Sequence, residues 1–268
     1  MFNLSGKVAI ITGGAGVLGS AMAKGLVQAG AKVAILSRTA SKVEKAVADI
    51  KAIGGEGLAL IADVLDESQL IDARNKVLKT WGGIDILVNA AGGNMKGATI
   101  MPDQDIFNLS MDDFTKVTDL NLKGTVLPTM VFAKEMATQK KGCIINISSM
   151  AAQQAITRVV GYSASKAAID NFTKWMAVEM AHKFGEGIRV NAIAPGFFIA
   201  EQNRRLLTNE DGSLTARGQT IVNETPVKRF GKPEELVSTL VWLCSEGSSF
   251  ITGIIVPIDG GFSAFSGV

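Results

Sequence analysis

Short apolar runs that alternate with longer amphipathic stretches constrain the fold of this chain more than any other feature of its sequence. Runs rich in Val, Ile and Ala predict strands at residues 7–12, 32–37, 57–62, 85–90, 143–148, 188–194 and 254–259. Amphipathic stretches predict helices at about 18–29, 41–53, 67–80, 111–138, 162–184 and 233–244. Alternating strands and helices form a parallel sheet, and strands without polar alternation are covered on both faces. The pattern therefore predicts an α/β fold, a doubly wound parallel sheet of about seven strands with helices on both faces.

The chain is long enough for one large domain. Its 268 residues are 47% hydrophobic and contain no linker, internal repeat or low-complexity segment, so we expect residues 1–268 to form a single domain. Two segments, 93–110 and 196–228, break the alternation, and both follow the predicted carboxyl end of a strand. Open α/β sheets bind ligands at that edge, so we expect 93–110 to be a functional insertion and 196–228 to be a substrate loop.

Composition and charge narrow the class of function. The 27 basic and 25 acidic residues are spread along the chain, which argues against nucleic acid as a partner. No apolar run reaches membrane-spanning length and no secretory leader is recognisable, so we expect no membrane partner and a cytoplasmic location. Cys143 and Cys244 lack metal-ligand spacing and are expected to be buried, reduced thiols. His182 is the single histidine, so a histidine base and a metal site are not expected.

Residues 11–20 read ITGGAGVLGS and predict a glycine-rich turn between a strand and a helix. The stretch fits the spacing G-x-G-x-x-G from Gly14, and also the spacing T-G-x-x-x-V-x-G from Thr12, in which Val17 stands where a further glycine is usual. In either spacing the glycines let the backbone approach a pyrophosphate at the amino end of the helix. Glycine-rich turns also serve packing alone, so the loop needs support from motifs elsewhere.

The end of the second predicted strand bears on the choice of nucleotide. An NAD-selective loop usually carries an acid there, whereas this chain has Ser37 and Arg38. An arginine can pair with a 2′-phosphate by charge-assisted hydrogen bonds, which favours NADP(H) and leaves NAD(H) possible. Alternatively, Arg38 stacks on adenine or points to water. Asp63, after the third strand, either accepts from the adenine amino group or caps the next helix.

A Ser, a Tyr and a Lys stand at spacings suited to proton transfer. Tyr162 and Lys166 are four residues apart in GYSASKAA and share one face of a predicted helix. A phenol has a pKa of about 10, and an ammonium group within about 4–6 Å lowers it, so we expect Tyr162 to act as an acid or base near neutrality. Ser149 ends the fifth strand and could hold a substrate oxygen, whereas Ser148 is expected to point into the fold. Asn121 lies in a predicted helix, where asparagine has no intrinsic advantage and a polar task is expected.

With these residues the chain resembles the short-chain dehydrogenase/reductase family over nearly its whole length. The matching pieces are TGGAGVLG, ADV, LVNAAG, the segment around Asn121, NISS, YSASK, VNAIAPG, KRFGKPEEL and SSFITGIIVPIDGG. The resemblance implies a Rossmann-type fold and an NAD(P)-dependent enzyme that interconverts a ketone and a secondary alcohol. It also implies the second spacing of the glycine loop, with Gly13 and Gly19 as its anchors.

The resemblance implies roles for individual residues. Tyr162 would be the general acid or base, Ser149 would fix the substrate oxygen, and Lys166 would lower the pKa of Tyr162 and hold the nicotinamide ribose. Asn121 would hold a proton-relay water. The implied cofactor-binding residues are Gly13, Gly14, Gly16, Val17, Leu18, Gly19, Ser37, Arg38, Asp63, Val64, Asn89, Ala90, Ala91, Gly92, Tyr162, Lys166, Pro195, Gly196 and Phe198.

Three residues depart from the family pattern. Val17 replaces the middle glycine of the loop, Ala90 replaces the second Asn of NNAG, and Ala200 replaces a Thr that commonly bonds the nicotinamide amide. None of these changes removes a proton-transfer group, so they bear on cofactor geometry and not on the reaction. The resemblance further implies a homotetramer packed through the helices at 111–138 and 162–184.

The substrate loop carries several cations near the predicted mouth of the site, namely Arg204, Arg205, Arg217, Lys228 and Arg229. They could bind an anionic substrate, or they could be solvated or paired with Glu201, Glu210 or Glu224. AGGN, the insertion before Asn121, PGFF followed by EQNR, and the tail GGFSAFSGV resemble the D-mannonate oxidoreductase (fructuronate reductase) branch, whose substrate is a sugar acid. The implied substrate contacts are Asn94, Ser149, Gln153, Tyr162, Asn203 and Arg204.

Other functions stay open at this point. A gluconate 5-dehydrogenase-like enzyme and a 3-oxoacyl thioester reductase would use the same catalytic groups. A non-catalytic nucleotide-binding sensor or scaffold characteristically loses the Tyr or the Lys, and both are present here at Tyr162 and Lys166. The sequence therefore favours an enzyme.

Overall fold

The computed structural model describes residues 2–200 and 203–267, and its centre is one parallel sheet in the order β3-β2-β1-β4-β5-β6-β7. Each predicted strand is present, with its ends shifted by a few residues at most. The strands are β1 (Val8–Thr12), β2 (Lys32–Ser37), β3 (Gly57–Ile61), β4 (Ile86–Asn89), β5 (Gly142–Ile147), β6 (Ile188–Pro195) and β7 (Ile255–Ile258). The predicted doubly wound, Rossmann-type sheet is confirmed.

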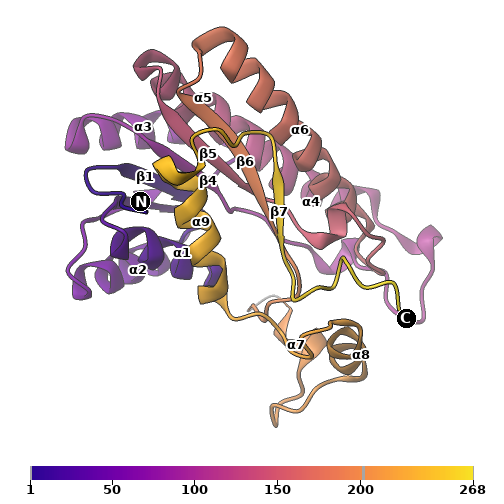
Figure 1. Ribbon diagram of the computed structural model, residues 1–268. Coiled ribbons are helices and arrows are strands. Elements are labelled where there is room, and N and C mark those ends of the chain that lie inside the picture. Colours follow the sequence, from indigo (N-terminus) through magenta and orange to yellow (C-terminus); the bar gives the residue numbers. More distant parts are fainter. Residues whose placement is uncertain (1, 201–202, 268) are drawn as a thin grey trace.

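Helices cover both faces of the sheet (Figure 1). One face packs against α1 (Val17–Gln28), α2 (Ala40–Ala52) and α9 (Val237–Cys244). The other face packs against α3 (Glu67–Trp81), α5 (Gly124–Gln139) and α6 (Val160–Phe184), where Phe132 is fully buried. Side chains along β1, β2, β4 and β5 enter the two cores alternately, which explains why these strand sequences are apolar without alternation.

The helix predicted at 111–138 is divided into three parts. α4 (Met111–Thr118) is followed by a π-helical turn at Asp119–Lys123 and then by α5. The predicted helix at 233–244 likewise begins as a 3-10 turn at Pro233–Leu236, which continues into α9. A π turn inside an α-helix is frequent at functional sites, and here it contains the buried Asn121.

The segment predicted as an irregular substrate loop contains two short helices, α7 (Arg204–Leu207) and α8 (Ala216–Glu224). Figure 1 shows them projecting beyond the helix layers that cover the sheet. Thr215 caps α8 by accepting a hydrogen bond from the backbone N–H of Gly218, at 3.1 Å. The insertion at 93–110 contains two 3-10 turns, at Lys96–Ala98 and Ile106–Asn108.

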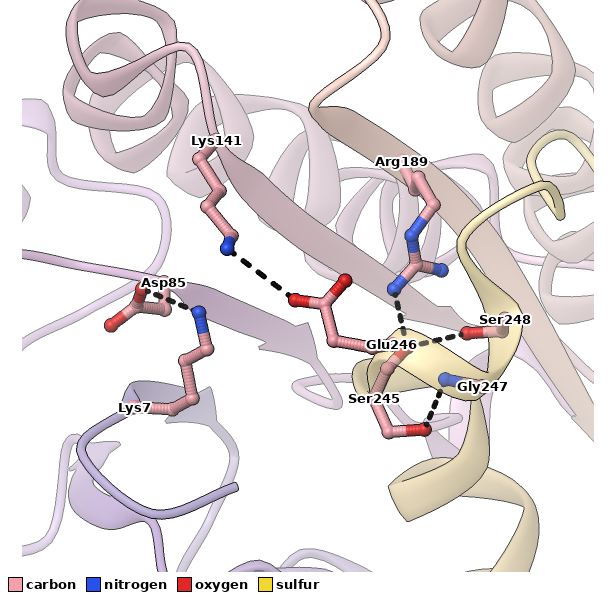
Figure 2. A network of polar contacts seen from close by, with 8 residues as sticks. All are labelled: Lys7, Asp85, Lys141, Arg189, Ser245, Glu246, Gly247 and Ser248. Carbon is pink, nitrogen blue, oxygen red and sulfur yellow. Dashed lines mark hydrogen bonds and ion pairs between the residues drawn. The ribbon is translucent and has the colours of Figure 1, made fainter. Parts of the chain in front are cut away.

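Charged side chains tie the amino ends of the strands together (Figure 2). Lys7, just before β1, bonds Asp85, just before β4, at 3.3 Å. Lys141, just before β5, pairs with Glu246 at 3.4 Å, and Arg189 of β6 donates to the carbonyl of Ser245 at 3.2 Å. These interactions lie at the amino ends of the strands. The glycine loop emerges at the opposite, carboxyl end.

The remaining sequence predictions concern thiols, the histidine and membranes. Cys143 and Cys244 are buried free thiols, as predicted. His182 lies exposed in the last turn of α6. Within residues 2–200 and 203–267, no helix combines the length and the apolar character needed to cross a membrane, and no group of three His, Cys, Asp or Glu residues could hold a metal ion.

Candidate active site

The glycine loop after β1 follows the second spacing. A Cβ on Gly19 would lie 2.4 Å from the carbonyl oxygen of Gly13, and one on Gly13, whose φ is +65°, would lie 2.7 Å from the carbonyl oxygen of Ala90. By contrast, the nearest atom to a Cβ on Gly16 would be 3.3 Å away. Gly13 and Gly19 are therefore the positions that no larger residue can occupy without a shift of the backbone.

Val17 is the first residue of α1, and its side chain is 42% exposed. It extends into a 530 Å³ pocket and does not press into the loop. Gly16 precedes it as the N-cap and offers no side-chain cap to the first N–H groups of α1. These N–H groups are free to bind an anion at the positive end of the helix.

The 530 Å³ pocket lies above the glycine loop and is lined by most of the predicted cofactor residues. Those that line it are Gly13, Gly16, Val17, Leu18, Gly19, Ser37, Arg38, Val64, Ala90, Ala91 and Gly92. Ala200, noted above as a departure from the family pattern, also lines it. Sequence analysis missed Ala15, Thr39, Lys42, Ala62 and Leu120, of which Lys42 is a cation of a type that binds phosphate.

Several predicted cofactor residues do not line this pocket. Gly14 packs against Ile11 and Ile35, and Phe198 is buried in the core, while Pro195 ends β6. Asn89 is also buried, and its amide donates to Thr129 and Asn146, each at 2.9 Å. The side chains of Asn89 and Phe198 are turned into the core beneath the site, so only their backbones are placed to back or border a cofactor.

Arg38 pairs with Asp63 at the rim of the pocket, with 3.7 Å between guanidinium and carboxylate. The Arg38 side chain is 68% exposed, so it remains accessible to a ligand phosphate. Asp63 does not cap α3, because Asp66 does so by accepting from the N–H of Gln69 at 3.1 Å. Asp63 accepts from the N–H of Leu65 at 3.0 Å and neutralises part of the positive charge of Arg38.

The structure brings Ser149, Tyr162 and Lys166 together at the carboxyl end of β5. The ammonium of Lys166 lies 5.5 Å from the centroid of the Tyr162 ring and donates to the carbonyl of Ile147 at 2.6 Å. The Ser149 hydroxyl accepts from the N–H of Ala151 at 3.2 Å and is a hydrogen-bond partner of Tyr162. The predicted constellation is therefore assembled.

The environment of Tyr162 opposes the predicted lowering of its pKa by Lys166. Burial raises the pKa of Tyr162 above its usual value, and the hydrogen bond with Ser149 offsets this only in part. Burial also lowers the pKa of Lys166 to about 8, against the opposing effect of the Asp170 carboxylate. The ammonium lies 5.5 Å from the centroid of the ring, and desolvation of the buried phenol is the largest influence on the pKa of Tyr162.

Ser148 points into the fold, as predicted. It is buried, and its hydroxyl donates to the Asp170 carboxylate of α6. Burial raises the pKa of Asp170, and the Ser148 hydroxyl works against that rise. Ser148 thus holds α6 against the end of β5, while Ser149 faces the pocket.

Asn121 anchors the segment that leaves β4. Its Oδ1 accepts from the N–H of Gly93 at 3.1 Å, and its Nδ2 donates to the carbonyls of Gly93 and Val117 at 2.7 and 2.8 Å. Both amide hydrogens are thereby committed to the backbone, so the side chain has no hydrogen to donate to the predicted relay water. A Cβ on Gly92 would lie 2.6 Å from the Asn121 Oδ1 and 3.5 Å from the Lys166 Nζ, so Asn121 fixes the chain beside Lys166.

A second pocket, of 460 Å³, contains Ser149 and Tyr162. Of the other predicted substrate contacts, Asn94 and Asn203 also line it, but Gln153 and Arg204 do not. Gln153 instead hydrogen-bonds Asp170, and Arg204 is exposed on the outside of α7. The residues that sequence analysis missed are Met95, Lys96, Thr99, Met101, Met150, Ala151, Ile156, Val159, Phe197, Leu206 and Leu207.

The two asparagines of this pocket differ in what they can offer a ligand. Asn203 uses both of its polar atoms on the loop, with Nδ2 donating to the carbonyl of Phe198 at 2.9 Å and Oδ1 accepting from Ala200 at 2.7 Å. Asn94 donates to the Thr99 hydroxyl at 2.7 Å, but its Oδ1 is buried without a hydrogen-bond partner. A buried acceptor of this kind is costly unless it is satisfied, and a substrate hydroxyl would satisfy it.

The cations of the loop fall into two groups, those that line the pocket and those that are bonded elsewhere. Arg205 and Arg217 line the 460 Å³ pocket together with Lys96 from the insertion. Arg229 is instead neutralised by Glu235, at 2.6 Å, and Lys228 donates to the carbonyl of Asn223. Glu201, one of the acids considered above as a partner, lies outside the described residues.

Comparison with known proteins identifies the family to which this chain belongs. The family model for enoyl-(acyl carrier protein) reductase matches residues 13–263, and an uncharacterized oxidoreductase of Bacillus subtilis is 49% identical over 99% of this chain and 98% of its own length. The chain belongs to the short-chain dehydrogenase/reductase family. It is therefore an oxidoreductase, and the expectation of an enzyme is confirmed.

Two solved structures resemble this short-chain dehydrogenase/reductase closely. A Haemophilus influenza protein, provisionally named a D-mannonate oxidoreductase and solved with bound NAD, has a TM-score of 0.92 and 42% identity over 99% of this chain and 98% of its own. A gluconate 5-dehydrogenase of Burkholderia cenocepacia, in complex with NADP and tartrate, has a TM-score of 0.86 and 30% identity over 98% of each chain. A nicotinamide cofactor is thus supported, and the neighbours contain either form.

Proposed function

We propose that this short-chain dehydrogenase/reductase interconverts the ketone and the secondary alcohol of a sugar acid of the D-fructuronate/D-mannonate type. The observation that carries this proposal is the composition of the 460 Å³ pocket. It combines the proton-transfer pair Ser149 and Tyr162 with the unsatisfied acceptor of Asn94 and with three cations, Lys96, Arg205 and Arg217. A polyhydroxylated carboxylate matches this set of groups.

The residues of the 530 Å³ pocket fit a dinucleotide. Gly13 and Gly19 keep the backbone of the loop open, and the uncapped amino end of α1 suits the pyrophosphate. Arg38 at the rim supports NADP(H) as the favoured cofactor, with NAD(H) possible because Asp63 already pairs with Arg38. When bound, the nicotinamide supplies or accepts the hydride.

The side chains of this protein would manage the proton and the position of the carbonyl. In the reduction, Tyr162 gives its phenolic proton to the carbonyl oxygen, and the Ser149 hydroxyl holds that oxygen in place. Lys166, charged below a pH of about 8, would stabilise the phenolate that is left and would hold the nicotinamide ribose. Asn121 acts through Gly92 and Gly93, whose position beside Lys166 it fixes.

Enzymes named for two other substrates are also relatives of this chain. A Gluconobacter oxydans gluconate 5-dehydrogenase is 31% identical, and a Synechocystis 3-oxoacyl-(acyl-carrier-protein) reductase is 33% identical. The first also acts, by its name, on a sugar acid and would use the same pocket. The three cations favour a substrate with its own carboxylate over an uncharged 3-oxoacyl group.

An initial-rate panel tests the proposal. D-fructuronate, 5-keto-D-gluconate and an acetoacetyl thioester are each assayed with NADPH and with NADH. We expect D-fructuronate to give the highest kcat/KM, and NADPH to exceed NADH. The highest kcat/KM for the thioester, or no turnover of either sugar acid, would overturn the sugar-acid assignment and leave the family unchanged.

We further propose that the protein forms a homotetramer through α5 and α6. Large apolar side chains are exposed on these helices, with Met130 on α5 and Trp175 and Val178 on α6 all more than half exposed. Such side chains on two neighbouring helices are suited to burial between subunits. Light scattering coupled to gel filtration measures the mass directly, and a monomer would contradict this. The cytoplasmic location stays a prediction.

A further inference from the structure

Arg217 connects the substrate loop to the segment that leads into the catalytic helix. It lies in the first turn of α8, and its Nη1 donates to the Thr157 hydroxyl at 3.0 Å while its Nη2 donates to the Thr157 carbonyl at 3.3 Å. Thr157 precedes α6, which carries Tyr162. The guanidinium therefore has a fixed position relative to the catalytic residues.

Arg217 borders two cavities. Its side chain lines the 460 Å³ pocket that contains Tyr162 and also a cavity of 420 Å³. The side chain is half-buried, whereas Lys96 and Arg205, the other cations of the 460 Å³ pocket, are exposed. Half-burial removes water that would otherwise compete for its N–H groups.

The positive charge of Arg217 is not matched by a carboxylate of the described residues. Glu224 lines the 420 Å³ cavity only, and it forms no ion pair with Arg217. Burial and the neighbouring Arg158 both lower the pKa of Arg217, so both disfavour its charge. Arg229 shows the contrast, because Glu235 binds it at 2.8 and 2.6 Å.

We infer that Arg217 binds the carboxylate of the substrate in the 460 Å³ pocket. A guanidinium has five N–H donors, and Thr157 uses two, which leaves donors for a two-pronged contact with a carboxylate. The bond to Thr157 places this contact at a set position relative to Tyr162, and this would select which ketone of a sugar acid is reduced. The inference rests on the proposed function and adds the residue that recognises the acid group.

Steady-state kinetics and binding of the full-length protein test this assignment. The variants are Arg217→Gln, Arg217→Lys and the matched control Arg204→Gln, whose exposed side chain lies outside the pocket. The substrates are D-fructuronate and D-fructose, in which a hydroxymethyl group replaces the carboxylate. Calorimetry measures the binding of D-mannonate independently of turnover.

We expect Arg217→Gln to raise KM for D-fructuronate and Kd for D-mannonate by about 10- to 100-fold, the range for a charge-assisted hydrogen bond. The ratio of kcat/KM for D-fructuronate over D-fructose should fall by a similar factor. Arg217→Lys should recover part of this loss. Arg204→Gln should change KM for D-fructuronate and Kd for D-mannonate by less than about 2-fold. The Kd of the nucleotide should also change by less than about 2-fold in every variant.

The outcomes separate the inference from the proposed function. If the wild type reduces D-fructuronate and Arg217→Gln has the same KM for D-fructuronate as the wild type, the inference is wrong and the function stands. If the wild type binds D-mannonate but reduces no sugar acid, and Arg217→Gln loses that binding, the function fails and the inference stands. Loss of affinity in Arg204→Gln instead of Arg217→Gln, or no binding of D-mannonate by the wild type, would overturn the inference.

Discussion

The ammonium of Lys166 lies 5.5 Å from the centroid of the Tyr162 ring while it donates to the carbonyl of Ile147 at 2.6 Å. A backbone carbonyl at the end of β5 therefore fixes the ammonium beside the Tyr162 ring. Ser149 is the group that bonds the hydroxyl and works against the rise in its pKa. Proton transfer by Tyr162 consequently depends on Ser149 and Lys166 in different ways.

The change Tyr162→Phe should abolish most turnover. It removes the proton donor and leaves the ring in place, so kcat should fall by about 10²- to 10⁴-fold, the usual contribution of a general acid. The Kd of the nucleotide, measured by fluorescence titration, should stay within about 2-fold, because the glycine loop is untouched. Retention of most of the wild-type kcat would refute the assignment of Tyr162.

The adjacent residues Ser148 and Ser149 allow a matched comparison of two alanine variants. Ser149→Ala should lower kcat by about 10-fold or more, because the substrate oxygen loses a hydrogen bond in the transition state. Ser148→Ala should leave kcat within about 3-fold but lower the free energy of unfolding by about 1–3 kcal/mol, because it removes a hydrogen bond from Asp170. Rates and urea unfolding curves of both variants would show the two effects, and the reverse pattern would exchange the roles of the serines.

Stability should depend on pH through Lys166. Its pKa is about 8 in the fold and 10.5 ordinarily, so folding is penalised by the buried charge below pH 8, and the penalty is relieved as pH rises towards 10.5. Over that window the wild type should gain on the order of 3 kcal/mol relative to Lys166→Met. Denaturant unfolding at several pH values measures the difference, and a constant difference from pH 8 to 10.5 would show that the folded pKa is not lowered.

Replacement of Arg38 should change the preference between cofactors. Arg38→Asp should lower kcat/KM for NADPH by about 10- to 100-fold and change that for NADH by only a few-fold, because only the 2′-phosphate loses a partner. Asp63→Asn is the control, since it frees Arg38 from its ion pair and should preserve or improve the use of NADPH. Equal losses with both cofactors in Arg38→Asp would mean that Arg38 does not contact the 2′-phosphate.

Two glycines of the loop should respond very differently to alanine. In Gly19→Ala the new Cβ would lie 2.4 Å from the Gly13 carbonyl oxygen, so the free energy of unfolding should fall by about 2 kcal/mol or more. In Gly16→Ala the nearest atom is 3.3 Å away and φ is −80°, so the change should stay within about 1 kcal/mol. Equal destabilisation in urea unfolding would contradict the assigned spacing of the loop.

The sheet was predictable because buried parallel strands are short and apolar throughout. The catalytic group was predictable because Tyr162 and Lys166 follow a helical spacing and Ser149 ends a strand, and such local rules survive in the fold. The π turn at Asp119–Lys123 was not, because one extra residue in a helical turn leaves the apolar pattern almost unchanged.

The substrate contacts were less predictable than the strands. α7 has one turn, from Arg204 to Leu207, and a single turn is too short for an apolar period to show that Arg205 and not Arg204 faces the pocket. Gln153 does not line the pocket because its side chain bonds Asp170, a residue of the next helix. The sign of the Tyr162 pKa shift depends on burial, which only the folded arrangement determines.

Among the described residues, the 460 Å³ pocket and the 530 Å³ pocket have no lining residue in common. Mutations in α7, α8 and the insertion can therefore alter which carbonyl compound is accepted without reducing affinity for the electron carrier. Evolution can therefore change the substrate of such an enzyme by single mutations that leave its binding of the electron carrier intact.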